Sequence, residues 1–156
     1  MITLAVSSQL RNRLLVELTH AGSREMGGVL MAEHVGENQF VLRNMTFHRP
    51  GMFASFVRTI DEALGALISF FRTTNNEYRR FNYIGEWHSH PRFSLEPSPQ
   101  DDDSMREIVS DPQVGASFVV LLVVRIGLPK QLAATLHTYL PDGSKHRSSL
   151  VWLDDS

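Results

Sequence analysis

The sequence predicts an α/β fold in one domain spanning residues 1–156, with a curved, mixed β-sheet flanked by helices. Three observations support this prediction. The 156 residues are 42% apolar and 21% charged, a balance typical of ordinary globular domains. Apolar residues recur at helical spacing in some segments and alternate or run continuously in others. Strand-like segments meet at short turns, which indicates antiparallel hairpins packed against helices.

The first elements are a short strand and a helix. Residues 2–6 alternate weakly like a strand, and Ser7 or Ser8 offers an N-cap for a helix that runs to about His20. Gly22 supplies the stop signal. The candidate core positions of this helix are Leu10, Leu14, Val16 and Leu18.

A hairpin and a second helix follow. Two β-rich runs, 27–32 and 39–45, flank the turn residues 36–38, which predicts an antiparallel pair. A helix is expected from about residue 59 to 73 because apolar residues recur there at helical spacing, opposite a more polar face. The apolar positions are Ile60, Leu64, Leu67, Ile68 and Phe71, and the polar ones include Asp61, Glu62 and Arg72.

The second half of the chain contains four predicted strands and one helix. The expected strand at 116–126 is apolar on both faces, as in a strand buried on both sides. The last two strands pair across Pro141-Asp142-Gly143, residues that favour a turn. In chain order, the elements are strand 81–90, helix 98–110 and strands 116–126, 131–140 and 146–153.

Composition excludes several classes of protein. The formal net charge of -2 provides no basic surface for nucleic acid. The absence of cysteine excludes disulfides, thiol nucleophiles and cysteine-bound zinc. The amino-terminal residues resemble no secretory signal, and the longest apolar run, 118–124, is too short to span a membrane, so a cytoplasmic location is expected.

The chemistry concentrates in residues 86–101. On a strand, His88 and His90 point to the same face and can converge on one metal ion. Pro91 favours the end of the strand there, which places the pair at an accessible rim of the sheet. Asp101 is the candidate third ligand, leaving a fourth position for water as in catalytic zinc sites.

Asp101 has a second interpretation as part of a helix start. Ser98 has the character of an N-cap, Pro99 that of a first helical residue, and Asp101 follows as the acid at the third position. Both interpretations can hold together, whereas Asp102 and Asp103 are expected to be solvated charges of the first turn. The remaining histidines show no ligand spacing: His20, His34, His48, His137 and His146.

A hydrolytic zinc site also needs a general base that does not bind the metal. Glu86 shares strand parity with the two histidines, and Glu25 stands at the head of another strand, beside Gly27 and Gly28. Spacing alone does not choose between the two glutamates. The paired glycines are also typical of a bulge or of a close crossing of two chain segments.

These residues together resemble the motif of the JAMM (JAB/MPN) metallopeptidase family. Glu25 precedes Gly27-Gly28, His88-Ser89-His90-Pro91 follows, and after seven residues come Ser98, two residues and Asp101. The resemblance spans nearly the whole chain. It implies that His88, His90 and Asp101 bind one Zn²⁺ per chain, that Glu25 is the general acid/base, and that Ser98 stabilises the tetrahedral intermediate.

The resemblance also implies a substrate class. Family members release ubiquitin-like proteins from conjugates or trim a carrier protein's tail, so an extended C-terminal tail is expected to bind by β-augmentation at a strand edge. The run from Gly85 to Pro91 resembles compact, stand-alone bacterial members encoded beside ubiquitin-like conjugation enzymes, several of them in antiphage systems. The implied partner is a ubiquitin-like protein or its conjugate, with a ubiquitin-like conjugation enzyme or a cGAS-like synthase as a further candidate.

Three other functions are alternatives to this one. Processing of a sulfur-carrier protein's tail would use the same chemistry and stays open. A metal-free scaffold of the same fold typically lacks one or more ligand residues, all of which this chain keeps. A role in DNA repair is disfavoured by the charge balance and by the lack of a helix-turn-helix pattern.

Overall fold

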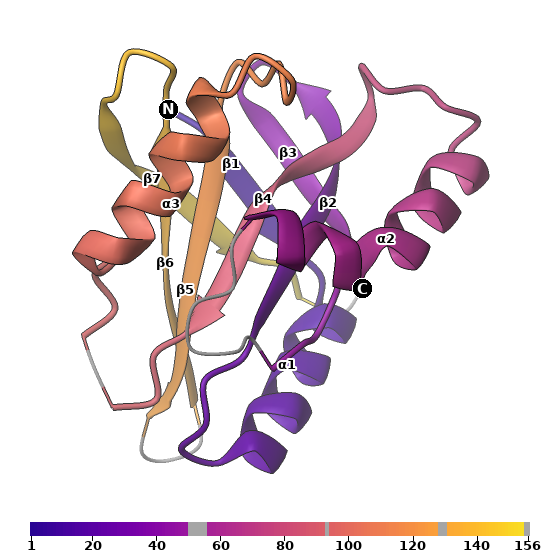
Figure 1. Ribbon diagram of the computed structural model, residues 1–156. Coiled ribbons are helices and arrows are strands. Elements are labelled where there is room, and N and C mark those ends of the chain that lie inside the picture. Colours follow the sequence, from indigo (N-terminus) through magenta and orange to yellow (C-terminus); the bar gives the residue numbers. More distant parts are fainter. Residues whose placement is uncertain (50–55, 93, 128–130, 155–156) are drawn as a thin grey trace.

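The computed structural model describes residues 1–49, 56–92, 94–127 and 131–154, and the side chains of these residues except 56–59. These ranges form three helices and seven strands (Figure 1). In chain order, they are β1 (Thr3–Val6), α1 (Ser8–Ala21), β2 (Gly27–Gly36), β3 (Gln39–Met45), α2 (Phe56–Thr73), β4 (Phe81–Ser89), α3 (Pro99–Ser110), β5 (Val119–Gly127), β6 (Gln131–Tyr139) and β7 (Lys145–Trp152).

The seven strands form a closed barrel in the order β1-β3-β2-β4-β5-β6-β7. The expected α/β class and mixed sheet are confirmed, and closure of the sheet into a barrel goes beyond the prediction of a curved sheet. Closure depends on β1, which pairs in parallel with β3 on one side and with β7 on the other: Leu4 lies opposite both Phe40 and Leu150. Strand β7 pairs with β6 through its first half and with β1 through its second, so it joins the two ends of the sheet.

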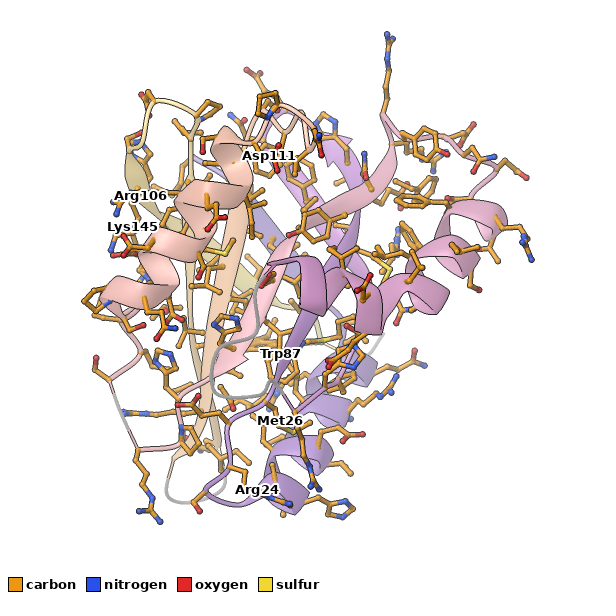
Figure 2. All side chains as sticks on the ribbon, in the orientation of Figure 1. Arg24, Met26, Trp87, Arg106, Asp111 and Lys145 are labelled. Carbon is orange, nitrogen blue, oxygen red and sulfur yellow. The ribbon has the colours of Figure 1, made fainter. Side chains whose placement is uncertain are left out.

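Helix α1 packs against the inward-facing side of the sheet. Its buried Leu14 and Leu18 belong to one apolar cluster with Leu4, Leu122 and Trp87. The helix begins as predicted, because the Ser7 hydroxyl accepts a hydrogen bond from the Leu10 amide (3.3 Å). Figure 2 shows Met26 and Trp87 between α1 and the sheet, with Arg24, Arg106 and Lys145 on the outside.

Helices α2 and α3 cover the outer face. Residues Ala63, Leu67 and Phe70 of α2 pack against Val29 and Met31 of β2. Helix α3 lies over β5 and β6 on the other side of the molecule (Figure 1). Because β5 faces the interior on one side and α3 on the other, its residues 119–124 are all fully buried, as its continuous apolar run predicted.

One predicted core position and two positions of the predicted apolar face of α2 are not buried. Val16, Leu64 and Ile68 are each about half exposed (54%, 48% and 48%). In α1 the buried stripe includes Leu14 and Leu18, which leaves Val16 on the opposite side of the helix. In α2 the predicted Leu67 does meet the sheet, but Ala63 and Phe70 are buried beside it, so the packed face is rotated away from Leu64 and Ile68.

A close crossing of chain segments explains one of the paired glycines. A Cβ atom added at Gly28 would lie 2.0 Å from the backbone oxygen of Thr46, so only glycine fits there. In the described part of the chain, no helix is long and apolar enough to cross a membrane.

Candidate metal centre

Strand β4 carries the two histidines to the outer face of the barrel. Trp87 points inward, is fully buried and donates from Nε1 to the Thr46 carbonyl (2.7 Å). Because side chains alternate along a strand, His88 points outward, toward the face that α3 covers. The His90 amide donates to the Val124 carbonyl (2.9 Å), which continues the alignment with β5 for one residue beyond the end of β4.

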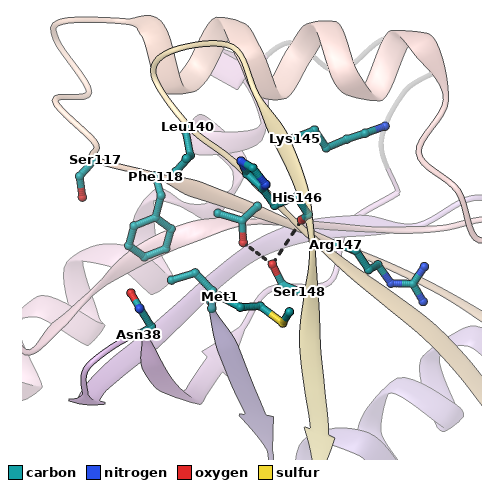
Figure 3. A pocket seen from close by; sticks show the side chains of 11 residues that line it. Met1, Asn38, Ser117, Phe118, Leu140, Lys145, His146, Arg147 and Ser148 are labelled. Carbon is teal, nitrogen blue, oxygen red and sulfur yellow. Dashed lines mark hydrogen bonds between the residues drawn. The ribbon is translucent and has the colours of Figure 1, made fainter.

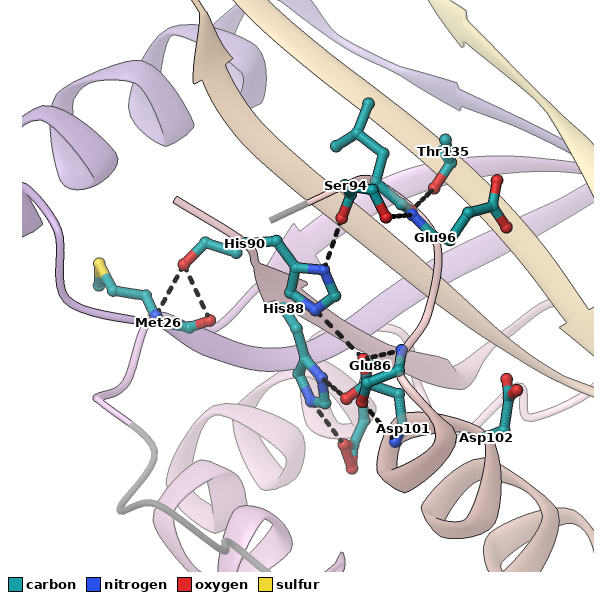
Figure 4. A network of polar contacts seen from close by, with 12 residues as sticks. Met26, Glu86, His88, His90, Ser94, Glu96, Asp101, Asp102 and Thr135 are labelled. Atoms are coloured by element: carbon teal, nitrogen blue, oxygen red, sulfur yellow. Dashed lines mark hydrogen bonds and ion pairs between the residues drawn. The ribbon is translucent and has the colours of Figure 1, made fainter. Parts of the chain in front are cut away.

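Helix α3 brings Asp101 to these histidines. The Ser98 hydroxyl accepts from the Asp101 amide (3.0 Å), and the Asp101 carboxylate accepts from the Ser98 amide (2.9 Å), with Pro99 at the start of the helix. The same carboxylate lies 3.0 Å from His88 Nδ1 through Oδ1 and 3.1 Å from His90 Nε2 through Oδ2 (Figure 4). One side chain therefore caps the helix and joins both histidines.

The three side chains shift one another's pKa values. Burial lowers the pKa of His88, but the nearby carboxylates of Asp101 and Glu86 outweigh it and raise the pKa to about 9. The hydrogen bond to Asp101 also raises the pKa of His90. Burial raises the pKa of Asp101, yet the bonds to both histidines outweigh this effect and hold it well below its usual range. At neutral pH an ionised carboxylate thus faces imidazoles that favour protonation, and a bound divalent cation would replace these protons.

Glu25 lies just before β2 and is exposed. Its two neighbours are anchored: Arg24 donates to the Ala21 carbonyl at the end of α1 (3.1 Å), and the Met26 amide donates to the Ser89 hydroxyl (2.8 Å). The Ser89 amide in turn donates to the Met26 carbonyl (2.9 Å), which fixes this segment beside the end of β4. Within the described ranges, no hydrogen bond or ion pair joins the Glu25 carboxylate to the histidines and Asp101.

The structure places the other candidate base, Glu86, directly beside a histidine. Its carboxylate is buried, and Oε2 lies 3.7 Å from Nε2 of His88. Ser98 is half-buried at the start of α3, where its hydroxyl contacts the Asp101 amide. The structure therefore joins His88, His90, Asp101, Ser98 and Glu86 in one network and leaves the Glu25 side chain outside it.

Sequence reasoning missed the residues that hold this network in place. His90 Nδ1 lies 3.0 Å from the Ser94 carbonyl, and the Thr135 hydroxyl donates to the Leu95 carbonyl (2.7 Å), which ties the loop before α3 to β6. No sequence signal marks these contacts, because two of the partners are backbone oxygens and Thr135 is 40 residues away from Leu95.

The expectation that Asp102 is only a solvated charge was wrong. Its carboxylate accepts a hydrogen bond from the Tyr139 hydroxyl and is 3.1 Å from Lys145 Nζ. These contacts join the first turn of α3 to β6 and β7, which hold the helix that carries Asp101. Asp103 is exposed, as expected.

The donor set fits zinc in its chemistry. Among the described residues, no group of three or more His, Asp or Glu side chains has its donor atoms spaced to hold a metal ion. Instead, the donor atoms touch one another at 3.0 and 3.1 Å. Two atoms bound at 2.0–2.1 Å to a tetrahedral ion are about 3.3 Å apart, close to the separations of Asp101 from each histidine.

A second feature, a pocket of about 720 Å³, lies elsewhere on the barrel. Phe118 and Leu140 line it together with the hydroxyls of Thr138 and Ser148, which bond each other at 2.6 Å (Figure 3). None of the predicted site residues lines this pocket.

Comparisons with known proteins agree with the fold and with the resemblance to the JAB-domain family. Residues 7–135 match the family described as prokaryotic homologs of the JAB domain. The chain belongs to this family.

Two individual proteins are similar to the chain. A protein of Enterobacter hormaechei subsp. hoffmannii (strain UCI 50), named CD-NTase/cGAS isopeptidase, is 26% identical over 124 residues, which cover 78% of this chain and 67% of that protein. A protein of Desulfitobacterium hafniense, known from a solution structure, superposes with a TM-score of 0.67 over 97% of this chain and 94% of its own, at 14% identity. The second likeness concerns the fold alone.

Proposed function

We propose that this chain is a zinc-dependent isopeptidase that cleaves after the C-terminal tail of a ubiquitin-like protein. The observation that carries the proposal is the carboxylate of Asp101, which contacts His88 and His90 at the end of β4. Two imidazoles and one carboxylate are the ligands of many hydrolytic zinc sites. The match to the JAB-domain family supports the same chemistry.

In this proposal, His88, His90 and Asp101 hold the zinc ion. When bound, zinc supplies Lewis acidity that activates water and polarises a carbonyl group. Glu25 accepts a proton from the attacking water and returns it to the leaving amine. Its exposed position, between two anchored neighbours, suits a residue that must meet both water and substrate.

Ser98 is proposed to donate a hydrogen bond to the oxyanion of the tetrahedral intermediate. Its oxygen accepts from the Asp101 amide, which leaves its own hydrogen for substrate. Because the cluster lies on the outer face of the barrel, an extended tail can reach it without entering the interior. His88 keeps 27% of its side chain exposed, which supports access from solvent.

The name of the Enterobacter relative supports a specific substrate. We infer that the chain removes a ubiquitin-like protein from a cGAS-like synthase in a bacterial antiphage system. Closure of the barrel between β1 and β7 removes the sheet edges that β-augmentation would use there. We propose instead that the tail binds along the segments that surround the cluster, beside the end of β4.

The test combines metal content with cleavage. Wild-type protein, Glu25→Gln and His88→Ala are dialysed without metal and analysed for zinc, then incubated with a ubiquitin-like protein fused through its C-terminal tail to a fluorescent protein. We expect about one zinc per chain and cleavage for the wild type, zinc without cleavage for Glu25→Gln, and neither for His88→Ala. For Glu25→Gln the rate should fall by about 10²–10⁴-fold.

Two outcomes would contradict parts of this proposal. Absence of zinc in the wild type, together with no uptake of added zinc, would remove the basis of the proposal. Full activity in Glu25→Gln would remove Glu25 from its role and leave the remaining assignments to be tested separately.

A further inference from the structure

Glu86 carries a buried carboxylate that the proposed chemistry does not use. It lies two residues before His88 on the same face of β4, and only 5% of the residue is exposed. Burying a charged carboxylate costs free energy unless a partner compensates it. Among the described residues, the ion-pair partner of Glu86 is His88, whose Nε2 is 3.7 Å from Oε2.

The other group near Glu86 offers it no positive charge. Burial, and after it the charge of Glu86, raises the pKa of Tyr83 well above its usual value, so this phenol stays neutral. His88 is thus the side chain that compensates the buried carboxylate of Glu86.

The imidazole of His88 lies between two carboxylates. Nδ1 faces Asp101 at 3.0 Å, and Nε2 faces Glu86. A neutral imidazole carries one proton, so a metal ion bound at Nδ1 would leave that proton on Nε2, the nitrogen that faces the Glu86 carboxylate at 3.7 Å. The lone pair then remains on Nδ1, on the side where the candidate ligand atoms converge.

His90 shows the same arrangement with a different acceptor. Its Nε2 lies 3.1 Å from Asp101, and its Nδ1 lies 3.0 Å from the Ser94 carbonyl. Each histidine therefore directs one nitrogen to Asp101 and the other to an oxygen outside the three candidate ligands. In metal sites, acceptors of this kind orient the histidine and select its tautomer.

We propose that Glu86 is a positioning residue that orients His88 so that its Nδ1 faces the zinc site. The inference rests on the proposed function, because it requires a metal at His88, His90 and Asp101. Figure 4 shows the Glu86 carboxylate beside His88, and its contact is with the ring nitrogen that does not face Asp101. The imidazole ring of His88 thus lies between Glu86 and Asp101. This arrangement favours a role for Glu86 in orienting His88 over a role in direct proton transfer.

The experiment measures zinc affinity by competition with a chromogenic chelator. Glu86→Leu removes the acceptor and should weaken zinc binding about 10–100-fold. Glu86→Gln keeps an amide oxygen that can still accept from Nε2 and should lie between Glu86→Leu and the wild type. Excess zinc should restore turnover of both variants, because a positioning residue acts through metal occupancy.

Glu33→Gln is the matched control. Glu33 is also a buried carboxylate of the same sheet, but its partners are Arg43 and Arg80, and it lies on β2, away from the cluster. This variant should bind zinc as the wild type does. Thermal unfolding of the metal-free variants checks that each protein is folded, and a folded Glu86→Gln suffices for the comparison if Glu86→Leu is not.

The outcomes separate the two proposals. A wild type without zinc overturns the proposed function. A wild type that binds zinc, with Glu86 variants that bind it equally well, overturns only the positioning role. Variants that bind zinc but stay inactive at saturating zinc also overturn it, because Glu86 would then act in proton transfer.

Discussion

Asp101 combines a local and a tertiary function in one side chain. Its position three residues after Ser98 makes it part of a capping box, which depends only on nearby residues. Its contacts with His88 and His90 depend instead on where α3 packs. The cap holds the carboxylate in one orientation before any metal binds, which reduces the entropy that metal binding would otherwise cost.

A different buried carboxylate, Glu33, stabilises the sheet. It accepts from Arg43 on β3 (2.8 Å) and from Arg80 before β4 (2.7 Å), so it joins three neighbouring segments. The hydrogen bonds to Arg43 and Arg80 lower its pKa, and burial opposes them less strongly. The folded chain therefore binds a proton at Glu33 less readily than the unfolded chain does.

This shift predicts a pH-dependent effect of Glu33→Gln. Because the folded-state pKa is depressed, the stabilisation by the Glu33 charge is complete above the unfolded value of 4.5 and is lost as the pH falls through the folded value. The variant should be less stable than the wild type near neutral pH and approach it in acid. Urea unfolding at both pH values measures this, and a difference that does not change with pH would contradict it.

At the scale of elements, β4 and α3 form the candidate site by their packing. The alternation of β4 sends Trp87 into the core and His88 outward, so burial of one fixes the direction of the other. Helix α3 is held at its start by the contacts of Asp102 with Tyr139 and Lys145. The histidines and Asp101 therefore lie on β4 and α3, two elements that are held in place by separate contacts.

Two serine N-caps among the described residues, Ser7 and Ser98, offer a matched test of α3. Ser98→Ala and Ser7→Ala each remove a side chain that accepts from a helix amide, and each should lower the free energy of unfolding by about 1 kcal/mol. Only Ser98→Ala should also lower turnover, by about 10²-fold or more, because Ser98 is the proposed oxyanion donor. Denaturation and cleavage assays measure both effects.

The control in this pair is Ser7, whose helix α1 lies on the inner face of the sheet. Equal losses of turnover in the two variants would show that the effect of Ser98 comes from stability alone. In that case Ser98 would keep its capping role and lose its proposed part in the reaction.

At the scale of the whole molecule, closure of the barrel sets the position of every strand. Two backbone segments cross closely at Gly28, where β2 passes Thr46. Gly27, the preceding residue, pairs with His88 of β4 and exchanges hydrogen bonds with His48 (2.9 and 2.7 Å). The paired glycines therefore belong to the packing that places β4 beside β2.

A pair of glycine substitutions tests this packing. Gly28→Ala should lower the free energy of unfolding by about 1–3 kcal/mol or more, because its Cβ would lie 2.0 Å from the Thr46 oxygen. Gly65→Ala, in the exposed interior of α2 with nothing within 4 Å, should raise it by about 0.5–1 kcal/mol. Chemical denaturation measures both, and a Gly28→Ala protein as stable as the wild type would contradict the crossing argument.

Local signals predicted the elements well and their packed faces less well. Ser7 and Gly22 mark the ends of α1 because caps depend on adjacent residues. The buried positions of α2 were predicted less accurately, since apolar residues occur on two neighbouring stripes. Only contact with Val29 and Met31 decides which stripe is covered.

The sequence by itself determined the class of the fold, most element boundaries and the three side chains that meet at the candidate site. It could do so because hydrophobic period, helix caps and motif spacing are properties of short segments. Only the tertiary structure decided that the sheet closes, that Glu86 rather than Glu25 contacts His88, and that Asp102 ties α3 to the barrel. Each of these features depends on contacts between residues far apart in the sequence. Burial and packing in the folded chain determine these contacts, and the order of residues along the chain does not.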